Sequence, residues 1–522
     1  MPPFRSDPPI VRLVNGFDRP LDNAVATART CYSSRVITPD EVARDEKARA
    51  LRDRLAESTY AAGHHTTLQH AHFQFVIERV SRQALWSFLH AHPFYNSEQV
   101  SQRYVAVKPG AVTRPDLPER AAARYDACVE RMHQTYAQLV EMLTPTAARF
   151  FYEVFPARAR ARETDKWAGA LQKKAQEVAR YALPVATHAH LYHTVSGLTL
   201  HRYHRMCRTG DVPTETRLLV EAMVACVNAA DPLFFRNIEA ALPAGGTPTG
   251  LGLAHGEKRR DPAAFNRAFD TSLGGRTSRL VDWKVNAEAT VADSVREVLG
   301  LLPDQLSHDA AIARVIDPAQ NPLLGEALDL GTLDKLTRAL HHPHYTFRKK
   351  LSHSADSQDQ RHRMVPGTRP DLAATFAGGR VPDVVIPALL AAAPEARAFF
   401  EERMAEVFAT IEDLRNDGVS DESALYLLPN AYPIRFEESG DLLNLHHKMT
   451  TRLCYNAQEE IWNATRDEVE QIRAVHPQLG QHLLPPCGLR LAAGRRPYCP
   501  EGPRYCGVPV WKIEPEHWSR TI

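Results

Sequence analysis

The chain has 522 residues, of which 44% are hydrophobic and 24% charged, and its formal net charge is +1. This composition is typical of a globular protein with roughly two to four domains, and it excludes a general affinity for the nucleic-acid backbone. No stretch is long and apolar enough to span a bilayer, and the start MPPFRSDPP lacks the apolar core of a secretory signal. Eight cysteines in so long a chain do not make a disulfide scaffold, so we expect a cytoplasmic protein.

An internal repeat is the most informative feature of the sequence. The segments from Gly63 to Tyr104 and from His341 to Pro370 each contain an aromatic-x-Phe run followed by a Val-Ser or Leu-Ser pair. A tripeptide rich in His or Arg follows in both copies. A single repetition on this scale predicts a tandem duplication of one domain rather than a solenoid.

The repeat and the local composition together predict the domain boundaries. The stretch PAGGTPTGLGLAHGEKRRDP is rich in Gly, Pro and charge, which is typical of a linker. We therefore expect a first domain over residues 1–242, a linker over 243–275 and a second domain over 276–522 that ends in a tail containing cysteines.

Each repeat begins with a short predicted strand, VRLVNGF in the first copy and RLVDWKV in the second. In the next predicted strand Phe73, Phe75 and Ile77 alternate with polar residues. Ser81 then suits the N-cap of a helix, and Ser352 is its equivalent in the second copy.

The helix after Ser352 is polar where its counterpart is apolar, with Asp356, Gln358, Asp359 and Gln360 in sequence. It is expected either to lie on the surface or to line a polar site. Long helices are predicted over residues 118–150, 162–183, 394–416 and 442–475, and short β-like pieces after Gly488. The fold class that follows is α+β, with two tandem domains that each hold a small, mostly antiparallel sheet and long helices.

Three segments carry residues suited to chemistry. In Arg361-His362-Arg363 two guanidinium groups flank an imidazole, and such groups match phosphate oxygens bidentately. Ser101-Gln102-Arg103-Tyr104 places a hydroxyl and a guanidinium on one loop. The segment from Arg452 to Ile461 reads as a helix with a cationic start. Taken alone, each segment is better explained as an ordinary feature: a charged helix end, a turn and an amphipathic helix, respectively.

Together these motifs resemble those of the flavin-dependent thymidylate synthases. That family's pattern reads roughly G-H-x-S-x-x-E-H-x-x-F-x-F-x-I-x-x-V-S-R, then H-Q-x-x-R-H-R, then S-x-R-Y. The first copy keeps Gly63-His64, His70, Phe73, Phe75, Ile77, Val80-Ser81-Arg82, Ser101, Arg103 and Tyr104. The second copy keeps Gln358, Arg361, His362 and Arg363, and the family's R-L-x-x-x-A-Q-x-E-I motif is matched from Arg452 to Ile461. Arg180, in ARYALP, looks like another family arginine near the nucleotide.

The resemblance implies a function and a set of site residues. In the family, reduced FAD activates deoxyuridine monophosphate, methylenetetrahydrofolate supplies the carbon, and NADPH reduces the flavin, so no enzyme nucleophile is needed. The implied nucleotide ligands are Ser101, Gln102, Arg103, Tyr104, Arg180 and Arg452, with Gln358 and Arg452 in catalytic positions. The implied flavin ligands are Arg361, His362, Arg363 and Gln99. The alternatives left open are a one-carbon transfer to another pyrimidine nucleotide or uridine, and a non-catalytic paralogue that binds nucleotide.

Each copy also departs from the family pattern, and the departures are complementary. The first copy has His90-Ala91-His92 in place of R-H-R, and Phe88 or Ser87 in place of the glutamine. It lacks the A-Q-x-E-I motif, and Arg205 or Arg208 is the candidate counterpart of Arg452. The second copy has MVPGTRP in place of the S-x-R-Y loop and Leu425 in place of Arg180. We therefore expect one composite site divided between the two copies, and a homodimer of such pseudodimeric chains.

The remaining cysteines and histidines give weaker signals. Cys454, Cys487, Cys499 and Cys506 could bind zinc or an iron–sulfur cluster, but their spacing is not C-x-x-C, so no metal is expected. The histidine clusters over 188–193, 201–204 and 341–344 lack carboxylate or cysteine partners at ligand spacing. They are expected to lie on helix faces or at interfaces.

Overall fold

The computed structural model describes residues 3–91, 94–159, 166–208, 212–236, 261–326, 330–379 and 381–520. The chain forms two compact units, and the division between them does not follow the repeat. Unit 1 comprises residues 1–134, 183–260 and 410–428, and unit 2 comprises residues 135–182, 261–409 and 429–522. Each unit therefore combines the sheet of one repeat with a segment of the other repeat.

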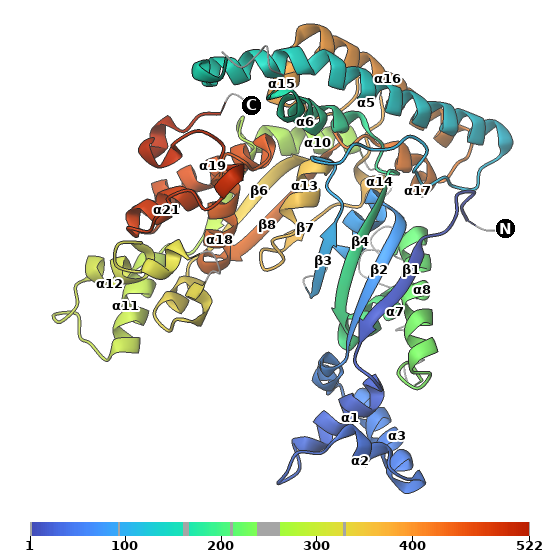
Figure 1. Ribbon diagram of the computed structural model, residues 1–522, viewed down its shortest axis with the longest axis vertical. Coiled ribbons are helices and arrows are strands. Elements are labelled where there is room, and N and C mark those ends of the chain that lie inside the picture. The colour runs from blue at the N-terminus through green and yellow to red at the C-terminus, as the bar shows by residue number, and fades with distance from the viewer. Residues whose placement is uncertain are drawn as a thin grey trace. The chain divides into compact units, whose positions relative to one another are not determined.

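Unit 1 is built on a four-stranded antiparallel sheet in the order β1-β2-β4-β3 (Figure 1). Its strands are β1 (Ile10–Gly16), β2 (His72–Ser81), β3 (Tyr95–Gln99) and β4 (His188–Ser196). As the alternation predicts, Phe73, Phe75 and Ile77 are buried in the core on one face of β2. A bulge that contains Arg79, with φ 59°, absorbs the one residue by which β2 exceeds its counterpart in unit 2.

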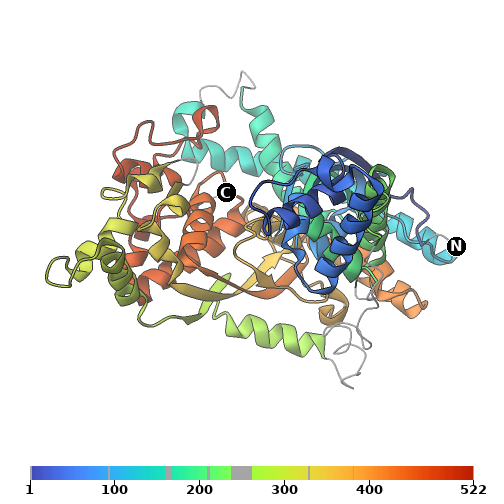
Figure 2. The same ribbon diagram turned by 90° about the horizontal axis from the view of Figure 1, so that it is seen from below.

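Helices pack against this sheet and extend beyond the ends of β1 and β2 (Figures 1 and 2). They are α1 (Pro20–Thr30), α2 (Pro39–Ala43), α3 (Glu46–Ala61), η1 (His65–His70), α4 (Arg82–Ala84), the π-helical turn η2 (Leu85–Leu89), α7 (Gly197–Met206), α8 (Thr214–Ala230), α17 (Asp421–Ala424) and η8 (Leu425–Leu427). The N-cap prediction for Ser81 is confirmed, since its hydroxyl accepts the N–H of Ala84 at 3.0 Å.

Unit 2 repeats the same sheet in the order β5-β6-β8-β7. Its strands are β5 (Ser278–Trp283), β6 (His344–Ser352), β7 (Gly367–Thr368) and β8 (Pro433–Asp441). Ser352 caps the next helix as predicted, accepting the N–H of Ala355 at 3.0 Å. The expected fold class, two α+β domains with small antiparallel sheets and long helices, is therefore confirmed.

The helices of unit 2 pack against this second sheet or against one another. They are α6 (Ala168–Ala179), η4 (Arg180–Ala182), α10 (Pro262–Ser272), α11 (Ala287–Leu299), α12 (His308–Ile316), η5 (Pro322–Gly325), η6 (Leu330–Leu333), η7 (Thr337–His341), α13 (His353–Asp359), α14 (Leu372–Thr375), α15 (Ala388–Ala391), α18 (Leu442–Leu453), α19 (Glu459–Val475), α20 (Pro477–Gly480) and α21 (Pro486–Ala492). Helix α10 lies within the range 243–275 that the composition suggests as a linker. The long helices α5 (Glu119–Val154) and α16 (Pro394–Asn416) each contain a boundary between the units.

Two sequence predictions of secondary structure are wrong. The helix expected over 442–475 is broken, because Cys454 has φ −59° and ψ 133° and ends α18 before α19 begins. The Arg452 motif is therefore a helix–turn–helix, stabilised by a bond from the N–H of Ala457 to the carbonyl of Cys454 at 2.8 Å. In place of β-like pieces, the described part of the tail after α21 has the 3₁₀ turns η9 (Gly502–Arg504), η10 (Val510–Lys512) and η11 (Pro515–His517).

Among the helices that the structure describes, none combines the length and apolar character needed to traverse a lipid bilayer.

Two buried histidines, His193 and His201, and the half-buried His188 make the stability of unit 1 depend on pH. Burial lowers the pKa of His188 to about 4 and of His193 and His201 to about 3. Below the unfolded-state value of about 6.5 the unfolded chain takes up protons that the folded chain does not, so stability is lost as pH falls from 6.5 toward these values.

We predict that His193→Phe reduces this dependence. The ring of His193 stacks on those of Tyr95 and Tyr203, and neither ring nitrogen has a hydrogen-bond partner among the described residues. Phenylalanine keeps the stacking and removes the group that titrates. Thermal unfolding at pH 7.5 and 5.0 should show a smaller fall in the midpoint for the variant than for the wild type. An equal fall in the unfolding midpoint of both proteins would contradict the role given to His193 in the pH dependence.

Candidate functional site

A buried glutamate ties together one strand end and one tyrosine in each unit. In unit 2, Glu460 accepts the N–H and hydroxyl of Ser352 at 2.5 and 2.7 Å, and also the hydroxyl of Tyr181. In unit 1, Glu215 accepts the N–H and hydroxyl of Ser81 at 2.7 and 2.5 Å and the hydroxyl of Tyr426 at 2.7 Å. Burial raises the pKa of both carboxyl groups, and the hydrogen bonds they accept oppose that rise.

The two tyrosines are exchanged between the repeats. Tyr181 comes from the first repeat and serves unit 2, whereas Tyr426 comes from the second repeat and serves unit 1. Neither was among the residues that the sequence singled out. A signal existed nonetheless, because both repeats keep a tyrosine two residues before Leu-Pro, in YALP and YLLP.

In unit 2 a chain of hydrogen bonds leads from Glu460 and Tyr181 to the predicted catalytic residues. The amide of Gln458 donates to the hydroxyl of Tyr181 at 2.5 Å and accepts from the amide of Gln358 at 2.6 Å. The guanidinium of Arg452 donates to the carbonyl of Gln358 at 2.8 Å and to Nε2 of His362 at 2.9 Å. The structure thus brings Gln358, Arg452 and His362 together, and adds Gln458, the N-cap of α19, which sequence reasoning did not assign to the site.

His362 is neutral in this arrangement. Its Nε2 accepts a hydrogen bond from Arg452, so that nitrogen carries no proton. Burial and the positive charges of Arg452 and Lys448 hold the pKa of His362 well below its usual value. The imidazole accepts this hydrogen bond and thereby orients the guanidinium of Arg452.

Arg180 adjoins the same network. It is buried, its Nε donates to the carbonyl of Glu177 at 3.0 Å, and its own carbonyl accepts from the amide of Asn430 at 3.0 Å. Because Tyr181 is the next residue, the exchanged segment brings Arg180 into unit 2 together with Gln358 and Arg452.

Three of the four residues expected to hold the flavin, Arg361, His362 and Arg363, lie in the turn after α13. Arg361 and Arg363 are half-buried and flank His362. Gln360 is buried, and both polar atoms of its amide lack a hydrogen-bond partner among the described residues. Since a buried amide without partners is costly, this side chain is suited to a polar ligand. Two guanidinium groups and one amide in a single turn fit a cofactor that carries phosphates.

An ionic cluster lies beneath α13 in unit 2 and has no counterpart among the described residues of unit 1. Lys349 lies 2.8 Å from Asp359, 3.0 Å from Glu438 and 2.9 Å from Glu468, and Lys448 also pairs with Asp359 and Glu438. All five side chains are at most 1% exposed. Although burial acts against ionisation, the lysines hold the pKa of Asp359 well below its usual value. The polar helix therefore lines a polar site, the second of the two expectations.

Unit 1 has apolar or aromatic residues at most of the same places. The strand registers and helix N-caps give the counterpart of each charged residue. They match Lys349 with Ile77, Asp359 with Phe88, Glu438 with His193, Lys448 with Tyr203 and Glu468 with Met223. By the same registers Ser87, not Phe88, is the counterpart of Gln358, and Pro213 is that of Gln458. The counterpart of Arg452 is the buried Cys207, so the expectation of Arg205 or Arg208 there is wrong.

The S-x-R-Y loop belongs to unit 1. The hydroxyl of Ser101 accepts the N–H of Arg103 at 3.3 Å, Gln102 is buried, and the guanidinium of Arg103 lies 5.3 Å from the ring centre of the exposed Tyr104. Gln99, on β3, accepts from the guanidinium of Arg82 at 3.3 Å. The nucleotide-binding and flavin-binding roles of these residues stay predictions.

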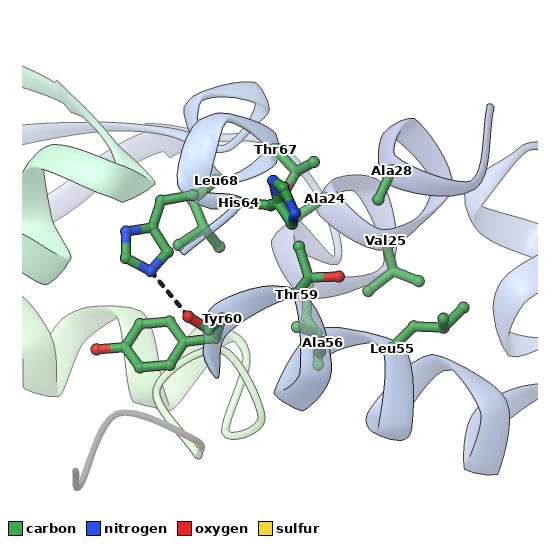
Figure 3. Close-up of a pocket in the computed structure, with 12 residues that line it drawn as sticks. Ala24, Val25, Ala28, Leu55, Ala56, Thr59, Tyr60, His64, Thr67 and Leu68 are labelled. Carbon is green, nitrogen blue, oxygen red and sulfur yellow. Dashed lines mark hydrogen bonds between the residues drawn. The ribbon is translucent and has the colours of Figure 1, made fainter. Parts of the chain in front are cut away.

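A separate apolar pocket lies in unit 1 between α1, α3 and η1 (Figure 3). His64 of the repeat's Gly-His pair borders it, and Nε2 of the neighbouring His65 lies 3.0 Å from the carbonyl of Tyr60. None of the residues expected to bind nucleotide or flavin lines this pocket.

Comparison with known proteins connects both repeats to one family. The model of the family described as thymidylate synthase complementing protein matches residues 12–233 and 307–478. A flavin-dependent thymidylate synthase of Geobacter sulfurreducens is 30% identical over 170 residues, which cover 32% of this chain and 70% of that relative.

Two further relatives carry the same name. One from Sulfurisphaera tokodaii is 30% identical over 151 residues, covering 28% of this chain and 57% of the relative. One from Clostridium tetani is 24% identical over 242 residues, covering 46% of this chain and 90% of the relative. The chain thus spans little more than half the length of the Sulfurisphaera protein where the two match.

The exchanged tyrosines provide a matched pair of variants. Tyr181→Phe and Tyr426→Phe each remove one donor from a buried carboxylate, so each should cost about 1–3 kcal/mol of unfolding free energy. Only Tyr181→Phe also releases Gln458, so only it should speed amide hydrogen exchange over residues 454–458. Denaturant unfolding and hydrogen exchange measure the two effects. Equal rates of amide hydrogen exchange over residues 454–458 in both variants would contradict the hydrogen bond from Gln458 to Tyr181.

The ionic cluster can be tested against its apolar counterpart. Lys448→Met should cost about 3–5 kcal/mol, because it leaves Asp359 and Glu438 without one of their two cations. Replacing all five charges with the residues of unit 1 should recover most of that loss. The combined variant carries Lys349→Ile, Asp359→Phe, Glu438→His, Lys448→Tyr and Glu468→Met. A combined variant less stable than Lys448→Met, by denaturant unfolding, would show that the charges are needed together.

Proposed function

The chain belongs to the thymidylate synthase complementing protein family, and on that basis we propose that it is an FAD-dependent enzyme that reductively methylates deoxyuridine monophosphate. Methylenetetrahydrofolate would supply the carbon and NADPH would reduce the flavin. The named relatives support the flavin and the reaction class, since each is a flavin-dependent thymidylate synthase.

The single observation that carries this proposal is the hydrogen-bonded chain from Glu460 to His362. It joins the residues of the R-L-x-x-x-A-Q-x-E-I motif to those of the R-H-R motif and fixes their side chains. Unit 1 has Cys207, Ser87 and Pro213 at the matching positions, which cannot form this chain. The second repeat therefore supplies the arginine–glutamine framework.

The bound flavin would supply the hydride chemistry, and the protein supplies orientation and charge. Arg452 and Arg180 place positive charge where an anionic nucleotide would bind, and the amide of Gln358 can donate to or accept from a pyrimidine ring. Arg361 and Arg363 would pair with the phosphates of FAD. The hydroxyl of Ser101 serves as a phosphate ligand in this scheme, not as a nucleophile, with Arg103 beside it.

Purified protein should be yellow, with flavin absorption bands, and should oxidise NADPH when deoxyuridine monophosphate and methylenetetrahydrofolate are both present. Flavin binding with turnover of a different pyrimidine would overturn the choice of substrate. Absence of flavin after reconstitution with FAD would overturn both enzyme readings and leave a nucleotide-binding paralogue.

A matched pair of arginine variants tests the framework. Arg452→Lys removes the paired donors to His362 and Gln358, so thymidylate formation should fall about 100-fold or more. Arg205→Lys, on α7 of unit 1, changes an arginine that donates to the hydroxyl of Tyr60 and should alter the rate by no more than about twofold. Single-turnover assays on both variants measure the difference, and similar rates would contradict the role given to Arg452.

A further inference from the structure

Four of the eight cysteines line one cavity in unit 2. Cys454 ends α18, Cys487 lies in α21, and Cys499 and Cys506 follow in the tail. None forms a disulfide, and all four are half-buried. Three separate stretches of the chain therefore deliver thiols to a single place, which their spacing in the sequence did not predict.

The four thiols lie close enough to influence one another. Burial raises the pKa of Cys454 to about 11 and of Cys487 to about 12, and the neighbouring thiols, including Cys499 and Cys506, add to both rises. The backbone N–H of Asn456 acts in the opposite direction by hydrogen-bonding to the sulfur of Cys454. The four thiols are therefore near neighbours around the cavity.

The tail around the cavity is irregular in structure, and Val510 and Trp518 attach part of it to the core of unit 2. After α21 its described residues form single 3₁₀ turns, without a longer helix or a strand. Hydrogen bonds attach it to the turn after α18, among them one from Tyr455 to the carbonyl of Ser519 at 2.9 Å and one from Asn456 to that of Arg504 at 2.7 Å.

Zinc and an iron–sulfur cluster place different demands on four thiols. A zinc ion holds four sulfur atoms at about 2.3 Å from one point. Within the described ranges no three His, Cys, Asp or Glu side chains converge in a way that could hold one metal ion. In a four-iron cluster each thiolate binds a different iron, so the sulfur atoms stand farther apart around a central space.

We propose that Cys454, Cys487, Cys499 and Cys506 bind a [4Fe–4S] cluster that fastens the C-terminal tail to the turn between α18 and α19. Each thiol gives up its proton to solvent and forms one sulfur–iron bond, and no oxidation of the protein is involved. The four thiols line one cavity, as the ligands of a shared cluster must.

The position of the cluster gives it a structural role beside the proposed active site. Cys454 follows Arg452 by two residues and precedes Gln458 in the same turn, so the cluster would fix the backbone that carries both. This consequence rests on the proposed function, whereas the presence of the cluster does not.

The test is metal and sulfide analysis of the full chain purified without oxygen. We expect about four iron atoms and four acid-labile sulfides per chain, with an EPR signal on reduction by dithionite. Cys499→Ser should lose most of the iron, and limited proteolysis should then cleave the tail faster. Cys226→Ser, which changes a half-buried thiol of unit 1, is the matched control and should keep it.

Each other outcome overturns the proposal. One zinc per chain without iron would identify a mononuclear site, and neither metal would leave four packed thiols. Iron unchanged in Cys499→Ser would place any cluster elsewhere. Because metal analysis needs no nucleotide, a protein with the cluster but no thymidylate formation would refute only the proposed function, and an active protein without iron would refute only the cluster.

Discussion

The buried glutamate at the start of α8 and of α19 is the interaction on which the rest of the structure depends. A carboxylate taken out of water is stable only if donors surround it. Glu215 and Glu460 each receive the N–H and hydroxyl of the serine that ends a central strand, and the hydroxyl of a tyrosine. One residue thereby fixes a strand end, a helix start and a segment from the other repeat.

The tyrosine that each glutamate receives from the other repeat makes the duplication more than a fusion of two independent domains. Tyr181 and Tyr426 each complete the unit built on the opposite repeat, so neither repeat alone supplies all the hydrogen-bond donors to its own glutamate. The exchange also carries Arg180 into unit 2, where Gln358 and Arg452 lie. The tandem arrangement therefore assembles residues of both repeats in one unit.

The two units share this glutamate–serine–tyrosine arrangement, but they differ in the buried residues between the central strands and the helix that follows Ser81 or Ser352. Unit 2 buries five charges whose attraction holds α13 against β6 and β8, with Gln358 on that helix. Unit 1 fills the matching space with Ile77, Phe88, His193, Tyr203 and Met223. Such an ionic core is seldom the most stable solution, so it is better understood as a means of orienting a polar helix.

Local patterns in the sequence determined much of the fold. Alternation placed Phe73, Phe75 and Ile77 on a buried strand face, and Ser81 and Ser352 were identifiable as N-caps, because these signals act between near neighbours. The motifs around Arg361 and Arg452 pointed to the family. Only the tertiary structure decided the exchange of tyrosines, the break at Cys454, the placement of Cys207 opposite Arg452 and the meeting of four cysteines. These depend on contacts between distant segments, which no local periodicity encodes.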